Sequence, residues 1–184
     1  MENAPDADAA VISSDALIYG GWLPAARIFF DETTLQARVQ RLEMLRERLP
    51  MPLYVYSTLM RTPRASFGNV EPPYYSKIGP AIFRYSELID KEDMYGLTLR
   101  ESLAKQAIKN NLPQADLNDW LQRRLKNYHV NKSLTELTAK YRFHYLAIGK
   151  DDNAPLSATH MEARYIKRDA FALSDQIFSD YTGR

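Results

Sequence analysis

Short apolar runs alternate along this chain with longer segments of helical periodicity, and this alternation is the feature that most constrains its fold. The runs are predicted to be strands at 9–12, 53–57 and 143–148. Neighbouring strands that run in the same direction need a crossover of a dozen or more residues, usually helical, and the intervening segments supply it. The pattern therefore predicts an α/β fold with a parallel sheet. We expect the first strand to be buried on both faces, as in such sheets.

About five helices are predicted from apolar residues at three- and four-residue steps and from capping residues. Their ranges are 31–49, 78–90, 98–110, 116–140, and a last helix that starts from a capping box at Thr159. Three strands are few for five helices, so we expect a single α/β domain or a fragment of a larger one. Segment 60–76 contains several prolines and is predicted to be a long loop, a kind of segment that is often functional.

The composition excludes several classes of function. The 24 basic and 23 acidic residues give a net charge of +1, which leaves no basic footprint for nucleic acid or anionic lipid. The absence of cysteine excludes disulfides, thiolate metal sites and a cysteine nucleophile. No glycine-rich phosphate loop, signal peptide or membrane-spanning run is recognisable. We expect a cytoplasmic protein whose partner is a small molecule, with no role for nucleic acid or membrane.

Aspartates follow two of the predicted strands. Asp15 comes after the first strand, and Asp151 and Asp152 come after the third. Ligands of parallel α/β folds bind at the carboxyl ends of the strands. We predict that these aspartates are catalytic acids or bases, or that they bind a divalent cation such as Mg²⁺ rather than Zn²⁺. The alternative is that one of them caps a turn.

The long loop carries candidate substrate-binding residues. Arg61 and Arg64 lie beside prolines and are predicted to clamp a carboxylate or phosphate, unless they pair with an acidic neighbour such as Glu71. Glu71 is itself predicted to add a carboxylate to the substrate-binding residues, and Tyr74, next to Tyr75, is predicted to stack on a sugar or base. The alternative is that the two rings anchor the loop on the core.

A polar row lies on the apolar face of the helix predicted over 116–140. Its members are Arg124, Asn127 and Asn131. Polar groups on a core-facing stripe must be hydrogen-bonded or must face a wet cavity. The row therefore either ties the helix to the sheet or loop, or lines the substrate site.

Several segments occur in the order found in a bacterial family that they resemble, domain-of-unknown-function family 4127. They are Ser14–Gly21 with Pro24 and Arg27, Tyr56–Pro63, Glu71–Tyr75, Gly79–Ser86, Arg123 and Arg124 with Asn127, Val130 and Asn131, and Ile148 and Gly149 with Asp151, Asp152 and Pro155.

The resemblance implies a fold and a set of residues, but no reaction, because the family has no established activity. Its members are longer, which implies that this chain is an internal portion of the family domain. The family pattern has Gln before the two aspartates and Gly after the following proline, where this chain has Lys150 and Leu156. A lysine beside the pair would neutralise it, which counts against a metal role.

The function expected from these residues is that of a hydrolase-like α/β enzyme acting on a polar small molecule such as a sugar derivative. The aspartates would do acid–base or cation-binding work, and the arginines and asparagines would position the substrate. The alternatives are a non-catalytic binding module for an anionic metabolite and an inactive, truncated fragment.

Overall fold

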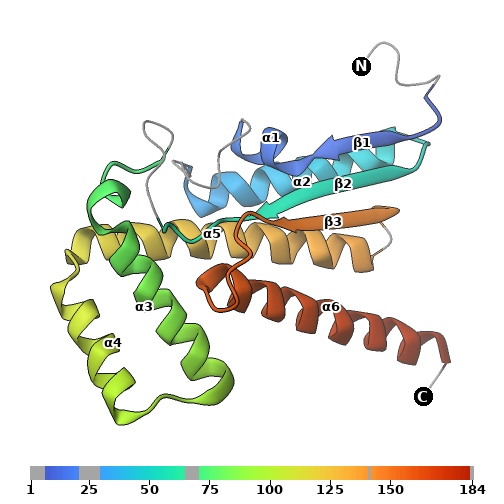
Figure 1. The fold of residues 1–184 in the computed structure, drawn as a ribbon. Helices are drawn as coiled ribbons and strands as arrows, with labels where there is room; N and C mark the ends of the chain where they lie inside the picture. The colour runs from blue at the N-terminus through green and yellow to red at the C-terminus, as the bar shows by residue number, and fades with distance from the viewer. Residues whose placement is uncertain (1–6, 21–29, 65–70, 141, 183–184) are drawn as a thin grey trace.

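A computed structural model describes residues 7–20, 30–64, 71–140 and 142–182. Its strands are β1 (Ala10–Ser13), β2 (Leu53–Leu59) and β3 (Tyr145–Lys150). They pair side by side in the order β1-β2-β3, and both pairings are parallel. The predicted α/β fold with a parallel sheet is confirmed (Figure 1). The helices are α1 (Ser14–Tyr19), α2 (Glu32–Arg48), α3 (Tyr75–Tyr95), α4 (Leu99–Asn111), α5 (Gln114–Ala139) and α6 (Ala158–Thr182).

The main core forms on one face of the sheet. Leu53 and Val55 of β2 pack there against apolar side chains of α1, α2 and α5. The spatial order of the strands follows the chain order, and crossovers between parallel strands are right-handed. Successive crossovers therefore place their helices on the same face. In Figure 1, α5 and α6 run along the sheet, and α3 and α4 project away from it as a helical pair.

The opposite face of the sheet is open in the described part of the chain. Val11, Tyr54 and Tyr145 form one row across the three strands and are 82%, 42% and 60% exposed. The prediction that the first strand is buried on both faces is therefore wrong. The reason is that strands in sequential order receive their helices on one side only.

The structure also shifts some element boundaries. Helix α1 was not predicted, because it has only six residues between its Ser13 N-cap and Gly20, which adopts a left-handed φ of 84°. Helix α3 begins at Tyr75, so Pro80 lies in its second turn rather than its first. Strand β3 extends to Lys150, which is part of the strand rather than of the loop after it.

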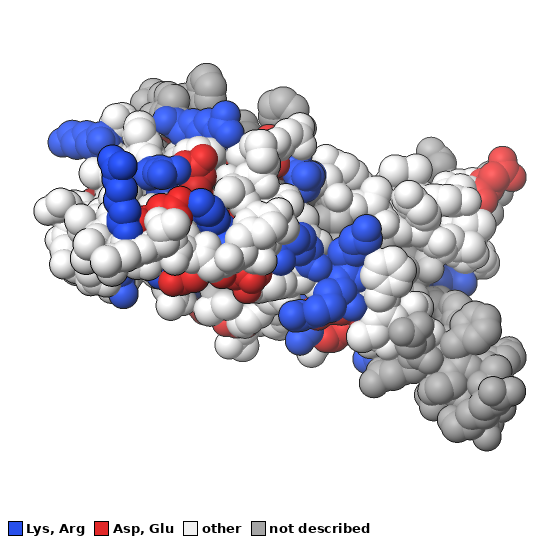
Figure 2. All heavy atoms as spheres, turned by 60° about the horizontal axis from the view of Figure 1, so that its bottom comes forward, with Lys and Arg blue, Asp and Glu red and all other residues white. Residues whose placement is uncertain are grey.

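A second, smaller core joins α3, α4 and α5 around Tyr75, Ile82 and Trp120. Helix α4 begins with the predicted capping box, formed by Thr98 and Glu101. Basic and acidic side chains are interspersed over the face shown in Figure 2, with no field of one sign. None of the helices in the described part of the chain combines the length and apolar character needed to cross a membrane.

Candidate functional site

The tips of β2 and β3 are level with one another and carry a cleft. Leu59 pairs with Lys150, and the Asp151 backbone N–H donates to the Leu59 carbonyl at 3.5 Å. The two following loops enclose a cleft of about 500 Å³. Its lining comprises Arg61, Thr62, Arg64, Asp151, Asp152, Asn153, Ala154 and Pro155. The structure thus brings together four of the predicted site residues, two arginines and two aspartates. We call this hollow the strand-tip cleft.

The two arginines of the strand-tip cleft have different surroundings. The Arg61 guanidinium forms an ion pair with the buried carboxylate of Glu71, with an Nη2–Oε1 distance of 2.5 Å. The pairing with Glu71 that the sequence left open is therefore present. The Arg64 guanidinium is exposed and lies 4.4 Å from the centroid of the Phe83 ring. Stacking on a ring leaves the donors at the edge of a guanidinium available, so Arg64 can still donate to a ligand.

The two aspartates of the strand-tip cleft also differ. The Asp152 Oδ1 accepts a hydrogen bond from the Ala154 N–H at 2.8 Å, which is the turn-capping alternative. Its Oδ2 is buried and has no hydrogen-bond partner in the described part of the chain. Partial burial raises the pKa of Asp151, Arg61 lowers it, and the carboxylates of Glu71 and Asp152 raise it. Asp151 therefore holds its proton more tightly than a free aspartic acid does.

Asp15 is not among the residues that line the strand-tip cleft. The register explains this: β1 ends at Ser13, opposite Tyr56, whereas β2 continues to Leu59. The Asp15 side chain is buried against Thr58, and burial raises its pKa while hydrogen bonds from Thr58 lower it in part. The catalytic role of Asp15 stays a prediction, but the shared hollow with Arg61 and Asp152 is not the arrangement found.

Arg124 of the polar row is buried and bound by protein groups. Its guanidinium donates to both carboxylate oxygens of Glu162, from Nε at 2.8 Å and from Nη2 at 2.6 Å. Its Nη1 also donates to the Arg61 carbonyl at 3.1 Å. Arg124 therefore ties α5 to α6 and holds the backbone at the edge of the strand-tip cleft.

Asn127 and Asn131 bind the end of β2 in the same way. Asn127 accepts from the Met60 N–H at 2.9 Å and donates to the Thr58 carbonyl at 3.0 Å. Asn131 also donates to the Thr58 carbonyl, at 3.3 Å. Of the two alternatives for the polar row, the structure shows the one in which it ties the helix to the sheet and loop. The row thereby supports the backbone that leads into the strand-tip cleft. Direct substrate binding by these residues stays a prediction.

Two members of this network were missed in the sequence. Thr159 and Glu162 were interpreted as a capping box, but α6 is capped by Ser157, whose Oγ accepts from the His160 N–H at 3.1 Å. Thr159 and Glu162 instead turn inward to Arg124, and the Thr159 hydroxyl donates to the Met60 carbonyl at 2.8 Å. Their three-residue spacing places them on one helix face, which was the available signal.

Tyr74 anchors the loop rather than lining the strand-tip cleft. Its hydroxyl donates to Asp119 at 2.7 Å, and its ring meets Tyr75 edge to face with centroids 5.0 Å apart. Tyr75 belongs to the second core. The anchoring alternative is therefore the one observed. Residues 65–70 of the predicted loop, and Gly21, Pro24 and Arg27 of the quoted motifs, lie outside the described residues.

A second polar cluster joins α3 to the start of α6. Asp90 is fully buried, and its carboxylate receives hydrogen bonds from the Ser157 N–H at 3.0 Å, His160 Nδ1 at 2.7 Å and Arg164 Nη2 at 2.7 Å. This cluster fixes the first turn of α6. It thereby supports the loop 151–155 that precedes the helix.

Binding of a divalent cation by the aspartates stays a prediction. Within the ranges given above, no three His, Asp or Glu side chains are grouped closely enough to hold a metal ion. Lys150 does not neutralise the aspartates as expected, because as a strand residue it points to the covered face of the sheet.

Comparison with known proteins gives one match. A family model described as "Protein of unknown function (DUF4127)" matches residues 1–183, so the resemblance noted in the sequence is confirmed over almost the whole chain. No curated protein matches, and no solved structure matches.

Proposed function

Because the chain belongs to the DUF4127 family, for which no function is stated, we propose a function from the strand-tip cleft alone. We propose a hydrolase-like enzyme that acts on a polar small molecule such as a sugar derivative. The observation that carries the proposal is the convergence of Arg61, Arg64, Asp151 and Asp152 at two adjacent strand ends. The expected cytoplasmic location rests on the sequence alone.

The charges of the strand-tip cleft favour a polar ligand over a strongly anionic one. Arg61 is paired with Glu71, and two aspartates line the same cleft as the Arg64 guanidinium. An anion would meet carboxylates on the same rim, which counts against the binding module for an anionic metabolite. Hydroxyl groups of a sugar can donate to the carboxylates and accept from Arg64.

Asp151 is the acid–base group in this proposal. Its raised pKa favours the protonated carboxyl, which can donate a proton to the oxygen of a leaving group. Water then adds to the carbon atom that the leaving group vacates, and Asp151 regains a proton from it. Asp152 holds the loop through its bond to Ala154, and its buried Oδ2 makes it a positioning residue rather than the proton donor.

The test is hydrolysis of a panel of 4-nitrophenyl glycosides by the full chain. Asp151→Asn is expected to lose about 100-fold or more in rate, the usual contribution of a general acid. Arg64→Met is expected to raise KM more than it lowers kcat. Glu47→Gln, an exposed carboxylate on α2, is the matched control and keeps full activity.

Two results would refute the proposal. The first is full activity of Asp151→Asn on a glycoside that the wild-type chain cleaves. The second is the absence of turnover for every glycoside, together with no sugar binding by saturation-transfer NMR.

A further inference from the structure

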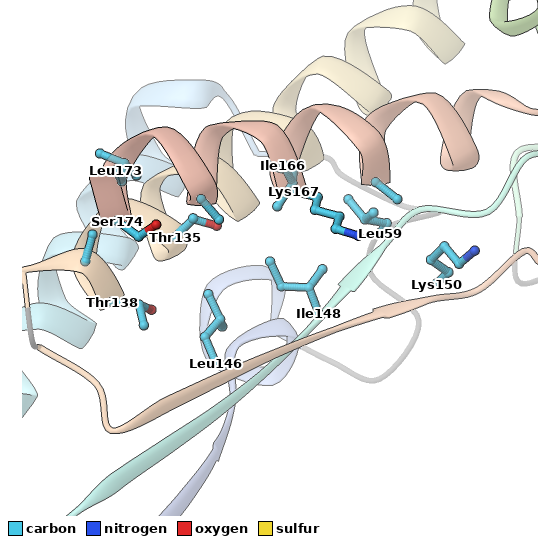
Figure 3. Close-up of a pocket in the computed structure, with 13 residues that line it drawn as sticks. Leu59, Thr135, Thr138, Leu146, Ile148, Lys150, Ile166, Lys167, Leu173 and Ser174 are labelled. Atoms are coloured by element: carbon cyan, nitrogen blue, oxygen red, sulfur yellow. The ribbon is translucent and has the colours of Figure 1, made fainter. Parts of the chain in front are cut away.

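A second cleft lies on the covered face of the sheet, between β3, α5 and α6 (Figure 3). Its volume is about 490 Å³, within the range of small-molecule sites. The walls are mostly apolar. Leu146 and Ile148 of β3 form one side, and Ile166 and Leu173 of α6 form the other. We call it the edge cleft, because β3 is the last strand of the described sheet.

The described lining of the edge cleft carries charge of one sign only. Lys150 and Lys167 are its charged lining residues, and the others are aliphatic side chains, Thr and Ser. Figure 3 shows both lysines toward one end of the cleft and Leu146, Thr138 and Leu173 toward the other. Lys150 and Leu146 are four residues apart on one strand, which separates the two ends by about 13 Å.

Neither lysine has an acidic partner among the residues that the structure describes. Among the ion pairs of the described residues, none involves Lys150 or Lys167. The Lys167 ammonium lies 5.8 Å from the centroid of the Phe171 ring. Cations without partners at one end of an apolar trough complement a molecule that has an anionic head and an apolar tail.

We infer that the edge cleft binds an amphiphilic anion, such as a medium-chain fatty acid. The carboxylate, or an equivalent phosphate, lies between Lys150 and Lys167, and the alkyl chain runs along Ile148 toward Leu146 and Leu173. This inference is independent of the strand-tip cleft, because the two sites share no lining residue. Lys150 lines the edge cleft and Asp151, the next residue in the sequence, lines the strand-tip cleft.

The test is calorimetric titration of the full chain with decanoate, decyl phosphate and decyltrimethylammonium below their micelle concentrations. Decanoate or decyl phosphate is expected to bind at one site, and the cationic amphiphile is expected not to bind. The two anions compared with one another distinguish a carboxylate site from a phosphate site. Shortening decanoate to nonanoate is expected to weaken binding about fourfold, the contribution of one buried methylene.

Variants locate the binding site. Lys150→Met and Lys167→Met keep the cleft apolar and are each expected to weaken decanoate binding about fivefold, the order of a partly exposed charge pair. Ala170→Trp fills the trough from an exposed position of α6 and is expected to abolish binding. Lys109→Met, at an exposed position of α4, is the control and leaves it unchanged.

The inference is overturned if decyltrimethylammonium binds as tightly as decanoate, or if both lysine variants bind decanoate like the wild type. Unchanged binding by Ala170→Trp, with its fold verified by circular dichroism, would place the ligand elsewhere and overturn it equally. So would a chain that binds none of the three amphiphiles, including one that instead self-associates through this face.

Discussion

Replacing Arg124 by Met tests whether the buried polar network holds the fold together. The substitution removes two hydrogen bonds to Glu162 and one to the Arg61 carbonyl, and it leaves the Glu162 carboxylate buried without its cation. Breaking a buried ion pair in this way costs about 3–5 kcal/mol. That is a large share of the about 5–15 kcal/mol that stabilises a typical domain.

For a chain of this size, each kcal/mol lowers the melting temperature by about 2–4 °C, so the expected loss is about 6–20 °C. Urea unfolding followed by circular dichroism gives the corresponding free energy. Arg100→Met, at an exposed position of α4, is the control and is expected to change stability by less than about 0.5 kcal/mol.

The pH dependence gives the prediction a second, independent readout. Burial raises the pKa of Glu162, although Arg124 lowers it in part. A carboxyl whose folded-state pKa is raised stabilises the fold below its unfolded pKa, and this stability is lost as the pH rises through the folded value. Without Arg124 the folded pKa rises further. The destabilisation of Arg124→Met is therefore expected to be larger at about pH 7 than at about pH 5.

A double variant separates two causes of lost stability, the broken Arg124–Glu162 ion pair and the changed packing around residue 124. In Arg124→Met with Glu162→Leu neither charge of this buried pair remains, so most of the lost stability is expected to return. The reasoning is refuted if Arg124→Met costs less than about 1 kcal/mol, or if its cost is the same at both pH values.

Three further predictions concern other parts of the fold and are measured by urea unfolding of the full chain. Asn127→Ala is expected to cost about 2–4 kcal/mol because the Met60 N–H and the Thr58 carbonyl lose a buried partner, and a loss below about 1 kcal/mol would contradict this. Thr98→Ala is expected to cost about 1 kcal/mol through the lost capping box of α4, whereas Thr98→Ser keeps it; equal stability of the two variants would argue against the cap. Gly149→Ala places a Cβ 2.8 Å from the Tyr56 hydroxyl. Because the Tyr56 side chain is exposed, we expect it to move away and the free energy of unfolding to fall by less than about 1 kcal/mol. A larger loss of stability that Tyr56→Ala does not relieve would show that the backbone moves instead.

The polar row on α5 shows which features of a buried network can be predicted from the sequence. Helical periodicity places Arg124 and Asn127 among apolar positions, and burial follows from that placement, because a stripe of this kind faces the core. Their partners do not follow from it. Glu162 lies 38 residues further along the chain, and only the packing of α6 against α5 brings its carboxylate to the guanidinium.

In the candidate site, too, one part could be predicted from the sequence and another part could not. Polar residues after β2 and β3 were predicted to converge, and the strand-tip cleft is formed by Arg61, Arg64, Asp151 and Asp152. Asp15 was predicted to join them and does not line the cleft, because β1 ends opposite Tyr56, before the end of β2. Strand length in the sequence does not specify register, so the position of one strand end relative to its neighbour was not available.

By itself, the sequence determined that parallel strands alternate with helical crossovers, since the spacing and apolar periodicity of each segment are local properties of the chain. The tertiary structure decided which face of the sheet receives the helices, leaving Val11, Tyr54 and Tyr145 exposed on the other. It also decided that Lys150 and Asp151 serve two different clefts. These outcomes depend on strand order and register, which arise from contacts between segments far apart in the chain.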